Sequence, residues 1–320
     1  MNAMIETHDL RHTFKTPQGA IEAVAGVDLS VEAGTIFGFL GPNGAGKTTT
    51  LRMLTTLLPP TGGEAVVAGC DLRRQPRELR LRIGYVGQRG GTDAQVTGRR
   101  ELLFQCRLHR MGAGHARRRA AELIDLFELD DCADRPTGGY SGGQRRRLDI
   151  AIGLVHRPPV LFLDEPTTGL DPQSRAHLWD ELRTLCSAGT TVFITTHYLE
   201  EADALCDNLA IIDHGRIVAE GTPEQLKRRI ACDVVTLGMA RDQATPAFDV
   251  LQGQPFVRQA GTEHGTVRLY VDAGEAAIPA ILRVLDGAGL DPQTIALSRP
   301  SLDDVFLRQT GRSLRERGGS

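Results

Sequence analysis

The chain has 320 residues, more than one hydrophobic core usually fills, so two domains are expected. Hydrophobic residues make up 41% and charged residues 24%, a globular composition that excludes long disordered or fibrous segments. The formal net charge of -3 argues against a nucleic-acid-binding protein, because such proteins usually carry a strongly basic surface. The sequence has neither an apolar run of the roughly 20 residues that span a membrane nor a secretory signal, which favours a cytoplasmic protein.

The first buried strand that the sequence predicts, residues 34–40, leads into a glycine-rich segment with the pattern Gly-x4-Gly-Lys-Thr. This pattern is typical of a P-loop, in which backbone N–H groups and the positive end of a helix bind phosphate. Only three of the 37 lysines and arginines are lysines, so Lys47 favours a close phosphate contact over a glycine-rich turn that binds nothing. The predicted phosphate-binding residues are Gly41, Pro42, Asn43, Gly44, Ala45, Gly46, Lys47, Thr48 and Thr49, and the Thr48 hydroxyl is also expected to bind Mg²⁺.

Between Gln88 and Arg157 the apolar residues recur at helical spacing, and no strand is predicted there. Helices are expected over residues 99–111 and 115–129, and a third helix begins after Ser141. The Ser141 hydroxyl and the N–H groups that follow it would form a second anion-binding site, made of Ser141, Gly142, Gly143 and Gln144. A plain helix cap that binds no ligand is the alternative interpretation.

Two further apolar strands end in polar residues. Residues 160–163 lead into Asp164 and Glu165, and residues 191–196 lead into His197. If these strands lie beside the P-loop strand in a parallel sheet, Asp164 would face Mg²⁺ and Glu165 would polarise the attacking water. Without a P-loop, a solvated turn would explain the two acids equally well, and a lone histidine at a strand end is usually structural.

After residue 230 a new series of predicted strands and helices begins. Strands are predicted at residues 234–239, 256–260, 266–271 and 294–298, and helices at 246–252 and 276–287. The order β-α-β-β-α-β predicts a small α+β domain with ferredoxin-like topology. We therefore expect a nucleotide-binding domain over residues 1–230, with a helical subdomain at about 89–157, and an accessory domain over residues 231–320.

The order of P-loop, Gln88, Ser-Gly-Gly-Gln, Asp164-Glu165 and His197 resembles the nucleotide-binding domain of ABC transporters over about the first 230 residues. The segment Pro-Ser-Leu-Asp-Asp-Val-Phe-Leu at 300–307 is further similar to the ending of the daunorubicin-resistance type of ABC-2 exporter ATPases. The resemblance implies an α/β fold, an ABC ATPase domain with a mostly parallel sheet and a helical subdomain, and ATP and Mg²⁺ as cofactors.

The resemblance also implies roles for single residues. Gln88 would contact Mg²⁺ or its water and sense the membrane partner, His197 would contact the γ-phosphate, and Asp171 would lie at the dimer interface. Phe14 would stack on the adenine, where the family more often has Tyr, although an aromatic residue in an early strand is about as often part of the core. The catalytic residues would be Glu165, His197 and Gln88, and the metal ligands Thr48, Gln88 and Asp164.

By the same resemblance, the chain is expected to be the motor of an exporter, bound to the cytoplasmic face of the membrane. It would form a homodimer in which Ser141 of one chain completes the site of the other, and it would drive a permease on a separate polypeptide. A regulatory or dimer-stabilising role is expected for the accessory domain.

A soluble ABC ATPase acting on a macromolecular assembly is the alternative function. A second ABC unit or a heptad run would favour it, and neither is found. A nucleotide-binding module without catalysis is disfavoured by Glu165 and His197.

Overall fold

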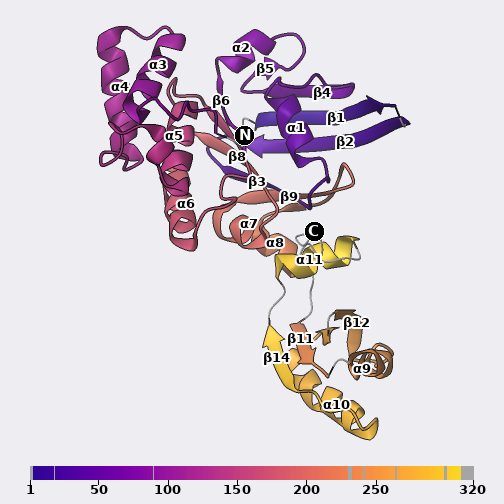
Figure 1. Ribbon diagram of the computed structural model, residues 1–320. Helices are drawn as coiled ribbons and strands as arrows, with labels where there is room; N and C mark the ends of the chain where they lie inside the picture. The colour runs from indigo at the N-terminus through magenta and orange to yellow at the C-terminus, as the bar shows by residue number, and fades with distance from the viewer. Residues whose placement is uncertain are drawn as a thin grey trace. The chain divides into compact units, whose positions relative to one another are not determined.

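The computed structural model describes residues 3–17, 19–88, 90–229, 233–240, 242–263, 265–298 and 301–310. These residues form two compact units, divided between Pro223 and Glu224 (Figure 1). Residues 231 and 232, residues 311–320 and Pro300 of the tail motif lie outside the described residues. The domain bounds 1–230 and 231–320 stay a prediction.

A six-stranded sheet forms the centre of the first unit. Its order is β10-β9-β3-β8-β7-β6, and its strands are parallel except for β10, which runs antiparallel to β9. The strands are β3 (Ile36–Leu40), β6 (Ile83–Val86), β7 (Val160–Asp164), β8 (Thr191–Thr196), β9 (Asn208–Asp213) and β10 (Arg216–Gly221). Every residue of β3, β7 and β8 is buried, as is typical of parallel strands that are covered on both faces. The predicted mostly parallel sheet is confirmed.

The register of the central sheet brings the carboxyl ends of three strands together. Leu40 of β3 pairs with Thr196 of β8, and Asp164 of β7 pairs with Thr195 of β8. Helices α1 (Lys47–Leu54), α6 (Pro172–Ser187) and α7 (Leu199–Leu205) follow β3, β7 and β8 in the chain. The polar residues after these strands therefore lie at one edge of the sheet, as the sequence predicts.

An antiparallel sheet of order β2-β1-β4-β5 shares its core with the central sheet. Its strands are β1 (Ala3–Thr16), β2 (Gly19–Glu32), β4 (Gly62–Val67) and β5 (Cys70–Asp71), and the short helix α2 (Pro76–Arg80) follows. Apolar residues of β1 and β2 such as Ile5 and Val24 are fully buried in the same cluster as Phe39 and Phe162 of the central sheet. This sheet contains Phe14, which lies in β1.

The segment after Gln88 is helical, as predicted. It contains α3 (Gly98–Leu108), α4 (Ala113–Leu126), the single 3₁₀ turn Thr137–Gly139 and α5 (Gly142–Gly153). In Figure 1 these helices gather on the side of the central sheet away from the β1–β2 pair. Helices α3 and α4 end earlier than the predicted 111 and 129, because Arg110 and Glu128 adopt left-handed φ angles of 59° and 47° that stop a right-handed helix.

A buried acid lies where α4, α5 and α6 meet. Glu181 of α6 is 8% exposed, and its Oε1 lies 3.3 Å from Nε2 of His177 and 3.9 Å from Nη1 of Arg147. Glu128, which follows α4, also approaches His177, at 3.2 Å. Burial raises the pKa of Glu181 to about 8, against the opposing effect of Arg147 and with a smaller contribution from Glu128.

Glu181→Gln should therefore make the protein more stable at high pH. A carboxyl whose folded-state pKa is raised stabilises the fold below its ordinary pKa of 4.5, and this contribution is lost as pH rises through about 8. The amide stays neutral, so the variant should melt about 2–4 °C or more above the natural protein near pH 9, with a smaller difference near pH 5. Asp180→Asn, at a neighbour whose side chain is 76% exposed, is the control. An equal difference in melting temperature near pH 5 and near pH 9 would contradict the raised pKa of Glu181.

The second unit has the predicted β-α-β-β-α-β order. It consists of β11 (Asp233–Gly238), α9 (Ala244–Leu251), β12 (Val257–Glu263), β13 (Thr266–Val271), α10 (Gly274–Gly287) and β14 (Thr294–Ser298), preceded by α8 (Pro223–Arg229) and followed by α11 (Leu302–Thr310). Its antiparallel sheet has the order β12-β13-β11-β14, which is the ferredoxin-like order. Residues of α9 and α10 such as Leu251 and Ile281 pack with Val235 and Leu269 of the sheet.

Helix α11 carries most of the tail motif and was not predicted as a helix. The Tyr270 hydroxyl of β13 donates to Oδ1 of Asp304 at 2.9 Å, and Ser301 donates to Oδ2 of Asp304 through its N–H at 2.8 Å and its hydroxyl at 2.6 Å. Asp304 therefore joins α11 to the sheet of its own unit. None of the helices that the structure describes is both long and apolar enough to cross a membrane.

Candidate active site

The P-loop connects the end of β3 to the start of α1. The Gly41 N–H donates to the Thr196 carbonyl at 3.2 Å, which ties the loop to the end of β8. Gly46, the residue before α1, has a φ of 107°, and a Cβ there would lie 2.5 Å from the Ala23 carbonyl oxygen. Only glycine meets both requirements. The glycine-rich spacing therefore lets the chain turn tightly into α1.

Lys47 is the buried cation of the site. Its side chain is 4% exposed, and Nζ donates to the carbonyls of Gly41 at 2.7 Å and Pro42 at 3.2 Å. Nζ also lies 3.3 Å from Oε1 of Glu165. Burial lowers the pKa of Lys47, and the charge of Glu165 opposes this shift. The structure therefore brings the P-loop lysine and the predicted catalytic carboxylate into direct contact.

Glu165 contacts both Lys47 and His197. Its Oε2 lies 3.2 Å from Nδ1 of His197, and its N–H donates to the Thr195 carbonyl at 3.1 Å. Burial raises the pKa of this carboxyl, but the contact with His197 and the charge of Lys47 outweigh burial and lower the pKa to about 2. Its φ of 45° is left-handed and costs about 1–2 kcal/mol for a residue with a Cβ. Strain of this kind is common at functional sites.

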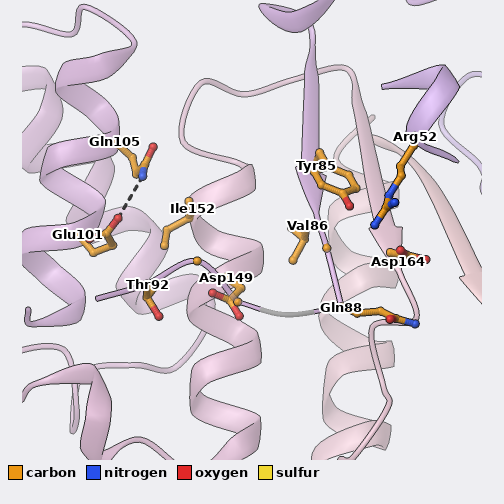
Figure 2. A pocket seen from close by; sticks show the side chains of 13 residues that line it. Arg52, Tyr85, Val86, Gln88, Thr92, Glu101, Gln105, Asp149, Ile152 and Asp164 are labelled. Atoms are coloured by element: carbon orange, nitrogen blue, oxygen red, sulfur yellow. Dashed lines mark hydrogen bonds between the residues drawn. The ribbon is translucent and has the colours of Figure 1, made fainter. Parts of the chain in front are cut away.

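Asp164 accepts two hydroxyl donors at the end of β7. It is 2% exposed, and its Oδ1 accepts from Oγ1 of Thr48 at 3.1 Å and from Oγ1 of Thr195 at 2.7 Å. Gln88 and Asp164 line the same pocket and lie close to each other in Figure 2. Hydroxyl, amide and carboxylate oxygens are ligands suited to Mg²⁺. The three predicted metal ligands are thus gathered at one edge of the sheet.

Arg146 is a buried residue that the sequence analysis missed. From α5, its Nη1 donates to the Gly87 carbonyl at 2.7 Å, its Nε to the Pro166 carbonyl at 2.9 Å and its Nη2 to the Asp164 carbonyl at 3.2 Å. It therefore joins the chain after β6 to the chain after β7. Nothing in the sequence distinguishes Arg146 from the arginines on either side of it; only its burial, with 7% exposed, does so.

Arg146→Ala is expected to destabilise the first unit strongly. Three carbonyls would lose their donor, and each unsatisfied buried group costs about 1–3 kcal/mol, so we expect a loss of about 3–5 kcal/mol. The melting temperature should fall by on the order of 10 °C. Arg145→Ala is the matched control, because Arg145 donates to one carbonyl, that of Thr137. Equal melting temperatures for the two variants would count against the bridging role.

The remaining predicted site residues lie elsewhere in the first unit. Phe14 is 39% exposed and packs against His12 with ring centroids 4.4 Å apart. Ser141 caps α5: its hydroxyl accepts from the Gln144 N–H at 3.2 Å, and the Gln144 side chain accepts from the Ser141 N–H at 3.0 Å. Asp171 caps α6 by accepting from the Ser174 N–H at 2.9 Å. Within the described residues, no hydrogen bond or ion pair joins these groups to the Lys47–Glu165 contact, and their ligand roles stay predictions.

Two family models match the chain. The ABC transporter model matches residues 24–168, and the model of the ATP-binding protein DrrA1-3-like, C-terminal domain, matches residues 221–310. The Daunorubicin resistance ATP-binding protein DrrA2 of Streptomyces coeruleorubidus is 47% identical over 92% of this chain and 92% of its own length. The Doxorubicin resistance ATP-binding protein DrrA of Mycobacterium tuberculosis is 41% identical over 92% and 90%. The Nod factor export ATP-binding protein I of Burkholderia orbicola is 41% identical over 92% and 93%.

Solved structures of ABC cassettes are also similar to this chain. A dimeric ATP-binding cassette in a post-hydrolysis state, bound to ADP and Pi, has a TM-score of 0.63 and 27% identity, covering 68% of this chain and 98% of its own. The cbiO1 protein of Clostridium perfringens, part of an ABC transporter complex, has a TM-score of 0.65 and 26% identity, covering 72% and 95%. Together with the site geometry, these similarities show that the chain belongs to the ABC transporter family of ATP-binding, ATP-hydrolysing proteins, in the group of the daunorubicin and doxorubicin resistance ATP-binding proteins.

Proposed function

We propose that this chain is the motor subunit of an exporter that removes a drug or another hydrophobic compound, with a permease on a separate polypeptide. The contact of Lys47 and His197 with Glu165 carries the proposal, because it unites a phosphate-binding cation with a carboxylate that can act on water. Relatives that match over most of their length, at 41–47% identity, are named for drug resistance or Nod factor export, which supports an export function.

The P-loop, with its nine residues Gly41 to Thr49, would bind the phosphates of ATP, and Phe14 would stack on the adenine. Mg²⁺ would be held by the Thr48 hydroxyl, the Asp164 carboxylate and the Gln88 amide oxygen. The 3.1 Å contact between Thr48 and Asp164 supports this assignment, since Mg²⁺ commonly takes one or two protein carboxylates and completes its shell with phosphate oxygens and waters. When bound, the ion would neutralise negative charge on the phosphates.

Glu165 would act as the general base, and its present contacts suggest how that role is controlled. Lys47 and His197 both stabilise the charged carboxylate, and a base with a pKa of about 2 accepts a proton poorly. A γ-phosphate would compete with Glu165 for contact with both residues. Once Lys47 and His197 contact the phosphate instead of Glu165, the pKa of Glu165 would rise toward the range in which a carboxylate can take a proton from water.

Hydrolysis would require two copies of the chain. Ser141 begins α5, whereas Lys47 begins α1, and an ATP molecule between two head-to-tail copies could bind the P-loop of one and Ser141 of the other. Asp171, at the start of α6, would lie at this interface. The similarity to a dimeric cassette supports the arrangement, and one chain carries every motif, which favours a homodimer.

The dimer would bind the cytoplasmic face of the membrane, and the helical segment at about 89–157 and Gln88 would contact the permease. The accessory domain over residues 231–320 would stabilise or regulate the dimer. Deleting residues 235–320 should then weaken dimerisation or transport; unchanged ATPase, dimerisation and transport would contradict this role.

Affinity capture tests the transport function. Tagged Glu165→Gln protein is captured from native membranes with ATP and Mg²⁺, and co-purified proteins are identified by mass spectrometry. A polytopic membrane protein in stoichiometric amount is the expected result, with Lys47→Ala as the control that binds ATP poorly. Recovery of ribosomes, nucleic acid or only soluble proteins would instead support a soluble ABC ATPase.

A further inference from the structure

Thr195 of β8 contacts both acids at the end of β7. It is 0% exposed, and it pairs with Asp164 in the parallel register of the central sheet. Its hydroxyl donates to Oδ1 of Asp164 at 2.7 Å and accepts from the Glu165 N–H at 3.1 Å. One side chain therefore joins the carboxylate assigned to Mg²⁺ to the backbone of the proposed general base.

These two contacts give the Thr195 hydroxyl a single orientation. A backbone N–H can only donate, so the Glu165 N–H occupies a lone pair of the hydroxyl and leaves its one hydrogen for Asp164. The same N–H also reaches the Thr195 carbonyl at 3.1 Å. Thr195 thus holds the backbone of Glu165 through two oxygens, at the residue whose φ of 45° is left-handed and strained.

The bond from Thr195 is the shorter of the two hydroxyl contacts to Asp164. The bond from Thr48 measures 3.1 Å, against 2.7 Å from Thr195, and short O–H···O⁻ bonds are the stronger ones. The Thr48 hydroxyl would turn its oxygen to Mg²⁺ when the ion binds, since it is itself an expected ligand. The bond from Thr195 would remain, and it would keep the orientation of the Asp164 carboxylate constant.

A purely structural role is the alternative, because any hydroxyl buried in a sheet needs a hydrogen-bond partner. Thr191, at the other end of β8, illustrates such a role. It is also 0% exposed, and its hydroxyl accepts from the Gly34 N–H at 2.9 Å. Its partner belongs to the chain that leads into β3, whereas both partners of the Thr195 hydroxyl belong to the candidate active site.

We propose that Thr195 is a positioning residue for ATP hydrolysis, whose hydroxyl orients the Asp164 carboxylate for Mg²⁺ and holds the backbone of Glu165 in place. This inference rests on the proposed binding of Mg²⁺ by Asp164. Thr195 acts only through these two neighbours, so removal of its hydroxyl should weaken the use of the metal and slow hydrolysis while leaving the P-loop contacts of Lys47 intact.

Thr195→Val tests this role in the full-length protein, because valine keeps the branched shape and removes the hydroxyl. Groups that orient a metal ligand typically contribute about 10- to 100-fold to metal affinity or activity, so the Mg²⁺ concentration for half-maximal ATP hydrolysis should rise at least about tenfold. Binding of a fluorescent ATP analogue in EDTA should match that of the natural protein, but Mg²⁺ should strengthen it less. Thr195→Ser, which keeps the hydroxyl, should restore the natural Mg²⁺ requirement.

Thr191→Val is the matched control, since it removes an equally buried hydroxyl from the same strand. Both valine variants should melt below the natural protein, because each leaves a buried polar group with fewer partners. Only Thr195→Val should need more Mg²⁺. Thr195→Ala, which makes no steric demand on the sheet, should show the same increase and provides a second test.

A natural Mg²⁺ requirement in Thr195→Val and Thr195→Ala would overturn the inference. An equal increase in Thr191→Val would overturn it too, because the effect would then follow from lost stability rather than from lost orientation. If the natural protein hydrolyses ATP without Mg²⁺, the assignment of Asp164 to the metal fails, and the role of Thr195 fails with it for a distinguishable reason.

Discussion

Lys47→Ala is expected to lose tight ATP binding. The ammonium is 4% exposed and held between two P-loop carbonyls, so it points where a phosphate in the loop would lie. Hydrogen bonds to charged groups contribute about 1.5–3 kcal/mol each, and two phosphate contacts would be worth about 3–6 kcal/mol. The dissociation constant for ATP should rise about 10²- to 10⁴-fold, measured by equilibrium titration with a fluorescent ATP analogue.

The chain offers a simple control for this change, because it has only two other lysines. Lys227→Ala, in α8, should bind ATP as the natural protein does. Lys47→Arg should bind nearly as poorly as Lys47→Ala, since the larger planar guanidinium does not fit a site that is closed by carbonyls at 2.7 and 3.2 Å. A dissociation constant for Lys47→Ala within about threefold of the natural value would exclude Lys47 as the main phosphate ligand.

The site was predictable from sequence where it depends on strand ends and glycine spacing. Continuous apolar runs before Gly41, Asp164 and His197 indicate buried parallel strands, and the ends of such strands meet at one edge of a sheet. This reasoning correctly brought Lys47 and Glu165 to the same place. It could not show that Glu165 contacts both Lys47 and His197. Such side-chain contacts depend on backbone angles like the φ of 45° at Glu165, which the sequence pattern does not reveal.

Residues that act through burial were not predictable. Arg146 belongs to a run of three arginines, and Asp149 is one acid in a helix of mixed composition. The surroundings of both side chains are formed by residues distant in sequence: Arg146 donates to the Gly87 carbonyl, and Asp149 lies next to Gly90. The β1–β2 hairpin was not predicted in its full length, because register shifts along the pair interrupt the regular alternation of polar and apolar residues. In the second unit, by contrast, short strands separated by clear turns were enough to predict the fold.

Glu165→Gln should bind ATP but hydrolyse it about 10²- to 10⁴-fold more slowly. The amide keeps the shape of the carboxylate and removes the group that would take a proton from water. It also removes the negative charge 3.3 Å from Lys47, which leaves that ammonium free for phosphate and should tighten ATP binding. Because the contacts of a γ-phosphate to both chains would persist, the variant should accumulate as a dimer with ATP and Mg²⁺, measured by size-exclusion chromatography with light scattering.

Nucleotide and residue controls make this result specific. With ADP the variant should remain monomeric, since ADP lacks the phosphate that would hold Ser141 of the second chain. Glu200→Gln, an exposed acid in α7 close in sequence to His197, should keep both the ATPase rate and the monomer–dimer balance of the natural protein. A Glu165→Gln variant with the natural ATPase rate would show that another group accepts the proton, and the low pKa that Lys47 and His197 impose on Glu165 would then reflect a purely structural ion pair.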